Sequence, residues 1–473
     1  MNSRIVFGTD GWRAIIADEY TFDNVRRCAF AVGQLVSRKA LAGRGVIVGY
    51  DKRFESEDFA EAAALALAAA GVRAYLCDRS EPTPAISHAI LSQRAGAGIT
   101  ITASHNPANY NGFKVRSDYG GAATPETIAE LEQIIADVPT ESVPRLTRAE
   151  ATERGLLVEI RPSIAYTEQI SRLVDLDGIR RSKLRIVADP MYGAGMGWLP
   201  SLLAGGSVHV VEINGERNPW FGGVSPEPIT RNLQKLFATV RSTSASVGVA
   251  TDGDADRLGL CDENGDFIDQ LRVFSLLTLY LLEVRGFRGP IVKTLSTSSM
   301  LDRLGEAYGV PVFETSIGFK YIAPKMVDTD AMIGGEESGG YAFRGHIPER
   351  DGIVSGIFFL DMMIQLSKSP SELVNFLFSK VGPHFYDRVD APFPALQRSA
   401  ILDRIRATSL DSIAGSPVVR TSRKDGFKWI AADRSWLLVR FSGTEPIMRV
   451  YAEAESMERV QELLSIGCAT AGV

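Results

Sequence analysis

The strongest constraint on the fold is a pattern of strands and helices that occurs three times in succession along the chain. Each copy reads strand, helix, strand, helix, strand, and then a polar loop. The third strands are Ile99–Thr102, Val247–Ala250 and Ala331–Ile333, and a polar loop follows each of them. Such alternation predicts βαβ units with parallel strands. Because ligands bind at the carboxyl ends of strands in α/β sheets, the shared position of the three loops indicates a common functional role.

The rest of the pattern predicts an α/β protein of four domains. A chain of 473 residues is too long for one core, and its length alone suggests about three or four domains. Beyond Gly382, two strands at Trp436–Arg440 and Met448–Ala452 and a helix from Met457 to about Ile466 predict a small α+β domain. The expected domain ranges are 1–147, 148–266, 267–380 and 381–473. The other strands are expected at Val46–Gly49, Ala74–Cys77, Leu184–Val187, Val208–Val211, Pro290–Lys293 and Val310–Phe313, and helices at Phe22–Lys39, Glu57–Ala70 and Ser298–Tyr308.

Composition argues against several classes of partner. The hydrophobic fraction of 45% and the charged fraction of 23% are ordinary for a globular protein. The net charge of −6, without a basic run, argues against nucleic acid. The alanine-rich stretch Ala60–Val72 is too short to span a bilayer, and residues 1–7 lack the apolar core of a signal peptide. The four cysteines fit no zinc spacing, so we expect free thiols in a cytoplasmic protein without membrane contact.

The first polar loop, Thr102–Pro107, places a serine at the end of a buried strand. The Ser104 hydroxyl is therefore expected at the sheet edge where ligands bind. His105 follows it directly and either takes part or only shapes the loop. Lys114, ten residues after Ser104, is a candidate acid, base or phosphate partner. An ordinary Ser/Asn/Pro turn is the alternative for this loop taken alone, and the other polar loops favour a functional site.

The second polar loop carries three alternating carboxylates, Asp252, Asp254 and Asp256. Hard oxygen ligands of this kind suit Mg²⁺ or Ca²⁺. An EF-hand is the competing interpretation, but its sixth position would be Arg257 instead of glycine, and a strand precedes the loop where an EF-hand needs a helix. Mg²⁺ commonly keeps positions open for phosphate oxygens, and Arg257 beside the carboxylates suits the same anion.

Two more loops suit a sugar phosphate. Glu336 and Ser338, separated by Glu337, lie between glycine pairs that let the backbone approach a ligand, and their oxygens suit sugar hydroxyls. A solvated acidic turn is the alternative for this loop taken alone. The loop near the C-terminus supplies a guanidinium, two hydroxyls and permissive backbone amides, a set that suits a phosphate. Its residues are Arg440, Ser442, Gly443 and Thr444.

These motifs resemble the α-D-phosphohexomutase family, which includes phosphoglucomutases, phosphomannomutases and phosphoglucosamine mutases. The resemblance runs from Phe7 to about Ala454, with all four loops in the family's order. It implies three topologically similar αβα domains with mixed, largely parallel sheets and a smaller α+β domain, arranged around a central cleft. It also implies a phosphorylated Ser104, Mg²⁺ held by Ser104 and the three aspartates, and glucose 1,6-bisphosphate as activator and intermediate.

The resemblance assigns further roles by matching positions. Arg257 matches an arginine that contacts the phosphoserine, and the Glu336 and Arg440 loops match the sugar-binding and phosphate-binding loops. Lys320 matches a residue that contributes to sugar binding. Arg13, His105 and Lys114 match residues near the reacting phosphate. The family acts on small hexose phosphates, so we expect no macromolecular substrate, and a monomer or homodimer.

The sugar is predicted from the variable middle of the sugar-binding loop. Glu336-Glu337-Ser338 resembles glucose-type mutases, whereas mannose-type enzymes often carry Glu-Met-Ser and glucosamine-type enzymes Glu-Gln-Ser. Gly339-Gly340 departs from the Gly-His that commonly ends the latter two loops. We therefore expect glucose phosphates first and mannose phosphates second, with phosphoglucosamine mutase as the alternative.

Two functions of other classes remain as alternatives. A serine hydrolase would pair Ser104 with His105, but adjacent residues do not readily form that geometry, and the chain lacks a Gly-x-Ser-x-Gly elbow. A non-catalytic sugar-phosphate-binding protein would keep the loops but would not need Ser104, Lys114 and the three aspartates together.

Overall fold

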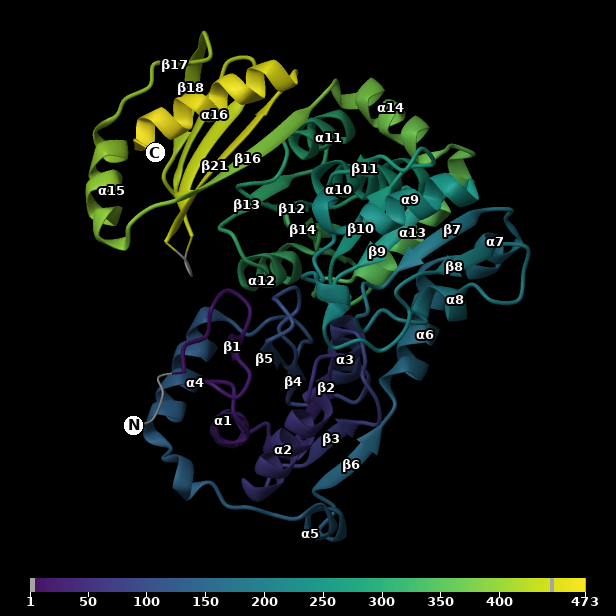
Figure 1. Ribbon diagram of the computed structural model, residues 1–473, viewed down its shortest axis with the longest axis vertical. Helices are drawn as coiled ribbons and strands as arrows, with labels where there is room; N and C mark the ends of the chain where they lie inside the picture. Colours follow the sequence, from purple (N-terminus) through teal and green to yellow (C-terminus); the bar gives the residue numbers. More distant parts are fainter. Residues whose placement is uncertain (1–4, 443–445, 473) are drawn as a thin grey trace.

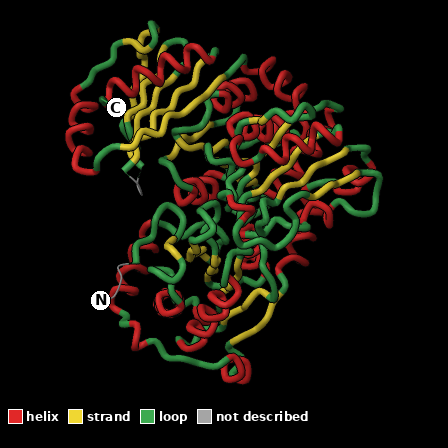
Figure 2. The backbone as a smooth tube through the Cα atoms, in the orientation of Figure 1, coloured by secondary structure: helices red, strands yellow, loops and turns green. Residues whose placement is uncertain are grey.

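The computed structural model describes residues 5–442 and 446–472, and the chain forms four sheets that define domains I to IV. The four domains follow one another in an arc, with domain I at the bottom of Figure 1 and domain IV at the upper left. Helices flank the sheets of the first three domains, whereas domain IV has helices beside an antiparallel sheet (Figure 2). The expected α/β architecture is confirmed.

Domain I is a six-stranded mixed sheet in the order β1-β5-β4-β2-β3-β6. Strands β2, β3, β4 and β6 are parallel where they pair, and β5 lies antiparallel between β4 and β1. The parallel strands are almost entirely apolar because helices cover both faces. The strands are β1 (Trp12–Ile15), β2 (Val46–Tyr50), β3 (Ala74–Cys77), β4 (Ala97–Ile101), β5 (Tyr110–Ser117) and β6 (Leu157–Ile160); the helices are α1 (Phe22–Arg38), α2 (Ser56–Ala69), α3 (Thr83–Ser92), α4 (Pro125–Asp137) and α5 (Arg148–Glu153).

Domains II and III repeat this arrangement with fewer strands, in the orders β11-β10-β9-β7-β8 and β13-β12-β14-β15. In each, three parallel strands are extended by an antiparallel strand after the polar loop. The elements of domain II are α6 (Pro162–Leu173), α7 (Leu176–Arg181), β7 (Arg185–Asp189), α8 (Trp198–Leu202), β8 (His209–Glu212), α9 (Gln234–Thr243), β9 (Val247–Thr251), β10 (Leu258–Cys261) and β11 (Phe267–Ile268). Those of domain III are α10 (Gln270–Leu279), β12 (Ile291–Thr294), α11 (Met300–Tyr308), β13 (Val312–Thr315), α12 (Phe319–Thr329), β14 (Ile333–Gly335), β15 (Tyr341–Phe343), α13 (Gly352–Leu366) and α14 (Pro370–Val381).

Domain IV has a fully antiparallel sheet in the order β16-β21-β20-β19-β18-β17. The expected final helix begins at Met457 as predicted and continues to Ala471, five residues beyond the expected end. The elements are β16 (Phe385–Pro392), α15 (Arg398–Ala407), β17 (Ser412–Ile413), β18 (Ser416–Ser422), β19 (Phe427–Ala431), β20 (Trp436–Phe441), β21 (Ile447–Ala454) and α16 (Met457–Ala471).

The sheets of domain I and domain II each include a strand that lies beyond the expected domain boundary. Strand β6 follows residue 147 yet pairs with β3 in the first sheet, and β11 follows residue 266 yet pairs with β10 in the second. Edge strands this short carry little sequence signal, so the sequence does not predict these pairings. The domain ranges otherwise stay a prediction.

The hydrophobic cores show which domains are joined most firmly. Domain I and domain IV each have a core cluster of their own, whereas one continuous cluster runs through domains II and III. Helix α13, which is apolar on nearly every face, lies in this shared core and contacts α7, β9, β10 and α10. In the described ranges, no helix combines the length and apolar character needed to cross a membrane.

Candidate active site

Ser104 lies directly beyond the carboxyl end of β4, as the sequence predicted. Its backbone has φ +52°, a left-handed conformation that is uncommon for residues other than glycine and costs about 1 kcal/mol or more. The buried Oγ donates a hydrogen bond to Asp252 Oδ2 at 2.8 Å and lies 3.3 Å from His105 Nδ1. The loop of domain I is thus held against the polar loop of domain II.

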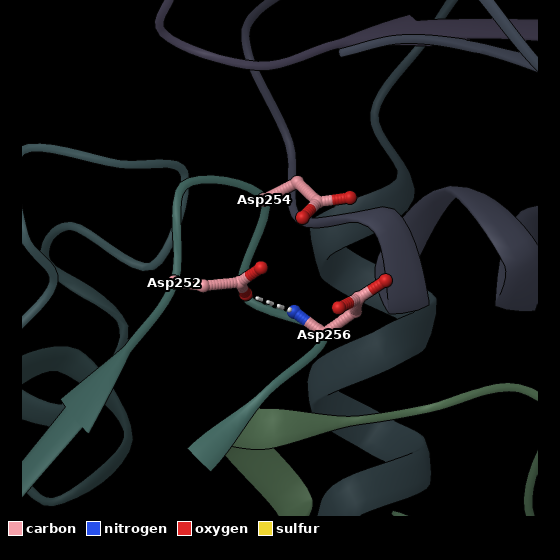
Figure 3. Close-up of side chains that lie close together, drawn as sticks. All are labelled: Asp252, Asp254 and Asp256. Atoms are coloured by element: carbon pink, nitrogen blue, oxygen red, sulfur yellow. Dashed lines mark hydrogen bonds between the residues drawn. The ribbon is translucent and has the colours of Figure 1, made fainter. Parts of the chain in front are cut away.

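The three aspartates follow β9 and point toward a common centre (Figure 3). Each can offer a carboxylate oxygen within 4.8 Å of the others, and all three side chains are completely buried. Asp252 Oδ1 is fixed by the backbone amides of Asp256 and Arg257, at 2.9 and 3.1 Å. Oδ1 of Asp254 and Oδ1 of Asp256 accept no hydrogen bond from the described part of the chain.

This oxygen set fits Mg²⁺. Buried carboxylate oxygens without donors are costly unless a cation shares them, and hard oxygen ligands are those that Mg²⁺ prefers. Burial, followed by the charges of Asp254 and Asp256, raises the pKa of Asp252 well above its usual value. A divalent cation among the three would relieve that repulsion. Asp252, Asp254 and Asp256 would hold it, with the Ser104 oxygen beside Asp252.

Gly253 explains how closely the two loops approach each other. A Cβ at this position would lie 2.3 Å from the carbonyl oxygen of Ser104, a distance that no side chain tolerates. The glycine between the first two aspartates is therefore required by contact between domains, since its φ is not in the left-handed region. No pattern in the sequence indicates this role for Gly253.

Lys114 comes from β5, the antiparallel neighbour of β4, which brings it next to the Ser104 loop. Its completely buried ammonium lies 2.8 Å from Asp254, 3.2 Å from Asp256 and 2.9 Å from Asp10. Burial alone would lower the pKa of Lys114, but the three carboxylates together raise it above the usual value. Lys114 is therefore a fixed positive charge in this structure.

Other predicted residues surround the same centre. Arg13 donates from Nη1 to Asn106 in the serine loop at 2.6 Å. The Arg257 guanidinium lies 3.4 Å from Glu227, and its Nε lies 4.0 Å from Asp256 Oδ1. Burial and then the nearby guanidiniums of Arg257 and Arg13 lower the pKa of His105 well below its usual value, so its imidazole is neutral.

Two residues that the sequence analysis missed connect the domains at this point. Arg350, at the start of domain III's α13 segment, bonds to Asp10 at 2.5 Å and to Asp256 at 2.9 Å. Asp10 also bonds to Arg116 at 2.7 Å. Isolated charged residues give no local pattern, so only the fold could reveal them. Asp10 does stand in the Gly-rich segment that supplies Arg13, which was the one available signal.

The sugar-binding loop predicted from sequence joins β14 to β15. Glu336 is buried, and burial as the largest influence raises the pKa of its carboxyl. Ser338 Oγ donates to Glu336 Oε2 at 3.2 Å, while Glu336 Oε1 accepts no bond from the described residues. Glu337 is bonded instead to Arg388 of domain IV, at 2.5 Å. Glu336 and Ser338 thus act as one pair, whereas Glu337 contacts another domain.

Lys320 and Arg440 belong to domains III and IV. Lys320 is at the start of α12 and lines a cavity of about 200 Å³ that is also bordered by Thr9 and Asp10 of domain I. Arg440, on β20, lies 3.4 Å from Asp425 and makes no ion pair with the aspartate cluster among the described residues. Ser442 is buried and donates its amide to Ile447. Gly443 and Thr444 lie outside the described residues.

The fold and the site define an enzyme that transfers phosphoryl groups on sugars, and the comparisons identify its family. Four family models match in chain order, described as phosphoglucomutase/phosphomannomutase α/β/α domains I, II and III and the C-terminal domain, over residues 4–141, 164–265, 269–381 and 402–465. The chain belongs to this family, the α-D-phosphohexomutases. It is therefore a phosphohexomutase, an intramolecular phosphotransferase, as the sequence analysis expected.

Three relatives illustrate the range of names. The chain is 33% identical to a phosphoglucomutase/phosphomannomutase of Thermococcus kodakarensis, covering 98% of this chain and 97% of the relative. It is also 33% identical to a "Probable phosphoglucosamine mutase" of Pyrococcus abyssi, covering 97% and 96%. A crystal structure from Thermus thermophilus that carries a phosphomannomutase name superimposes with a TM-score of 0.85 at 34% identity, over all of both chains.

Proposed function

We propose that this phosphohexomutase interconverts hexose 1-phosphate and hexose 6-phosphate through a phosphoserine at Ser104 and a hexose 1,6-bisphosphate. The observation that carries the proposal is the 2.8 Å hydrogen bond between the Ser104 hydroxyl and Asp252 inside the buried aspartate cluster. No other described serine combines a strand-end position in domain I with contact to that cluster. The roles proposed for the site residues rest on this arrangement and on the family's motifs.

The reaction balances without an outside phosphoryl donor once Ser104 is phosphorylated. The bond between phosphorus and Ser104 Oγ breaks, a bond from phosphorus to the free sugar hydroxyl oxygen forms, and the proton of that hydroxyl ends on Ser104 Oγ, which becomes a hydroxyl again. The bisphosphate then turns over and returns its other phosphoryl group to Ser104 by the reverse step. Phosphoryl transfer depends chiefly on positioning and on offsetting charge on the transferring oxygens.

Several groups of the chain supply positive charge that offsets the charge on these oxygens. A Mg²⁺ ion bound by Ser104, Asp252, Asp254 and Asp256 would act as a Lewis acid on the phosphoryl oxygens. Lys114 and Arg257 contribute fixed positive charges beside the same cluster. Arg440, which presents a guanidinium fork in domain IV, is suited to hold the phosphate that is not transferred.

The sugar is proposed from the loop between β14 and β15. Glu336 and Ser338 would contact the sugar hydroxyls that glucose and mannose share, and the Glu-Glu-Ser loop resembles glucose-type mutases. We therefore propose glucose 1-phosphate as the best substrate and mannose 1-phosphate as the second. Phosphoglucosamine mutase is the second candidate, because a relative that matches nearly the full chain carries that name.

The mechanism is tested by measuring the mass of the intact protein after incubation with glucose 1,6-bisphosphate and Mg²⁺. One phosphate on Ser104 is expected, and Ser104→Ala is expected to lose both the added mass and nearly all mutase turnover while remaining folded. Turnover like that of the wild type in Ser104→Ala would sink the phosphoserine mechanism.

The substrate is tested by comparing kcat/KM for glucose, mannose and glucosamine 1-phosphates with trace bisphosphate activator present. A hydrogen bond lost at the 2-position changes preference by about 1–2 kcal/mol, roughly five- to thirtyfold. The highest kcat/KM for glucosamine 1-phosphate would replace the glucose assignment with the second candidate and leave the mutase mechanism in place.

A further inference from the structure

A completely buried arginine lies directly beneath the serine loop. Arg53 comes from the segment between β2 and α2 and has no accessible surface. Its Nη2 donates to the carbonyl oxygens of Ser104 and Asn106, both at 2.7 Å, and its Nη1 donates to those of Pro107 and Tyr110, at 2.9 and 3.1 Å. One guanidinium therefore donates hydrogen bonds to four backbone carbonyls between Ser104 and Tyr110.

The same guanidinium is itself fixed from below. Its Nε lies 3.3 Å from Asp51, whose carboxylate also accepts bonds from the Arg53 amide and from Thr102 Oγ1. Thr102 Oγ1 in turn accepts the backbone amide of Ser104 at 2.8 Å. The amide and the carbonyl of Ser104 are therefore both held by one network, in which Asp51 and Arg53 are the charged members.

This network explains how Ser104 keeps an unfavourable backbone conformation. A residue other than glycine at φ +52° persists only where its surroundings over-determine it. Bonds on both sides of the Ser104 Cα supply that constraint. A planar guanidinium can serve four acceptors at fixed angles, whereas the ammonium of a lysine has three donors on a flexible stem. The arrangement is therefore specific to arginine.

Domain II contacts the same arginine. The guanidinium lies 4.8 Å from the centre of the Phe221 ring, a cation–π contact across the boundary between domains I and II. Phe221 is buried and itself has φ +51°, and Gly222 follows at φ +66°. The Ser104 carbonyl that Arg53 holds is also the atom against which Gly253 packs. Arg53 thus touches the elements that set the serine loop against the aspartate loop.

We propose that Arg53 is a positioning residue for phosphoryl transfer: it holds Ser104 Oγ in register with the aspartate loop, and Phe221 keeps the guanidinium in place. The inference rests on the proposed phosphoserine mechanism. Without Arg53, the loop relaxes and Oγ shifts relative to Asp252. A shift of about 1 Å at the reacting atom can cost about 100-fold in rate. Sugar and phosphate contacts from domains III and IV are untouched, so kcat falls far more than KM rises.

The test compares two buried arginines of domain I in the full-length protein with Mg²⁺ and glucose 1,6-bisphosphate. Arg27, on α1, is also buried and donates to the carbonyls of Ile135 and Val138, far from the serine loop in the chain. R53M is expected to lower kcat for glucose 1-phosphate by about 100-fold, with KM within about threefold of wild type. R27M makes the same chemical change and is expected to lower Tm while keeping kcat within about twofold.

Intact mass provides the second readout. R53M is expected to take up phosphate on Ser104 more slowly from glucose 1,6-bisphosphate than R27M does, and R53K is expected not to restore the rate. Equal kcat values in R53M and R27M, or full rescue by R53K, would overturn the proposal. Absence of phosphate on Ser104 in the wild type would instead refute the phosphoserine mechanism on which it rests.

If R53M does not fold, the F221L variant tests the proposal instead. This change removes the aromatic face and keeps an apolar side chain, so the fold and Tm should survive. A fall in kcat of about five- to thirtyfold is expected, because a desolvated cation–π contact contributes roughly 1–2 kcal/mol to holding the guanidinium. A kcat equal to that of the wild type would overturn the role of the Arg53–Phe221 contact.

Discussion

At the scale of single residues, the site is a balance of buried charges. Asp254 and Asp256 share the Lys114 ammonium, and Asp256 also bonds to Arg350. Asp252 has backbone amides and the Ser104 hydroxyl, but it forms no ion pair with a basic side chain of the described residues. Burial of an incompletely neutralised carboxylate group is costly, and this is the physical reason to expect a bound cation.

Removal of the metal should therefore change both activity and stability. Chelation is expected to abolish mutase turnover, and added Mg²⁺ to restore it. At a hundredfold excess over its Kd, Mg²⁺ should stabilise the folded protein by about 2.7 kcal/mol, measured as a concentration-dependent rise in Tm. Asp254→Asn keeps the side-chain shape and should lose most of that rise. An undiminished Mg²⁺-dependent rise in Asp254→Asn would show that the cation binds elsewhere.

At the scale of elements, the apolar strands were predictable and the polar ones were not. The strands β2, β3, β7 and β9 begin within one residue of their expected positions, because buried parallel strands are continuous apolar runs. By contrast, β5 contains Asn111, Lys114 and Arg116, and its sequence gives no such run. Its strand conformation comes from pairing with β4 and β1, which no local pattern predicts.

The residues of the candidate site also divide into those that a local sequence pattern predicts and those that it does not. Ser104, the three aspartates and Glu336 could be predicted because they stand in short motifs at the ends of recognisable strands. Arg53 and Arg350 could not, because each is a single cation whose partners in the site lie 50 or more residues away in the chain. The functional roles of all these residues remain predictions, and Gly443 and Thr444 also lie outside the described residues.

The turn between β3 and α3 provides a pH-dependent contribution to stability. Glu81 is buried there, and burial raises its pKa to about 7, while a hydrogen bond with Ser163 of α6 partly opposes that rise. The folded protein therefore holds a proton that the unfolded chain releases near pH 4.5. The contribution of Glu81 to the free energy of unfolding is greatest below that pH. It decreases as the pH rises toward 7, by about 3 kcal/mol in total.

Glu81→Gln should remove that slope. The amide stays neutral, so the fall in Tm between pH 5 and pH 7.5 is expected to be smaller in Glu81→Gln than in the wild type. Thermal unfolding of both proteins across this range, in buffers of matched ionic strength, measures the difference. Parallel curves would contradict the prediction and would show that the Glu81 carboxyl is ionised at pH 5 in the folded protein.

At the scale of the whole molecule, domain IV is attached by different contacts from those that join domains II and III. The latter share one continuous core, whereas domain IV contacts domain III through a separate, small apolar cluster, in which Leu295 packs against Trp436, Leu438 and Tyr451, and through polar groups. Lys428 bonds to Glu314, Asp425 accepts the Ile317 amide, and Arg388 bonds to Glu337. Domains that are joined outside a large shared core are able to move relative to each other. Such movement would let domain IV, with the phosphate-binding role proposed for Arg440, adjust to either end of the substrate.

We expect the bond between Arg388 and Glu337 to couple the movement of domain IV to the sugar-binding loop. Arg388→Met removes it and is expected to raise KM for glucose 1-phosphate by about three- to tenfold, since a partly buried charge-assisted bond contributes roughly 1 kcal/mol. The ratio of kcat/KM for glucose and mannose phosphates should stay constant, because Glu337 faces domain IV. Arg434→Met is the matched control: its ion pair with Glu306 also joins the two domains but is 51% and 62% exposed, so little change is expected. Equal effects of the two variants would show that the Arg388–Glu337 bond has no special role. An altered sugar ratio in Arg388→Met would show that Glu337 contacts the sugar directly.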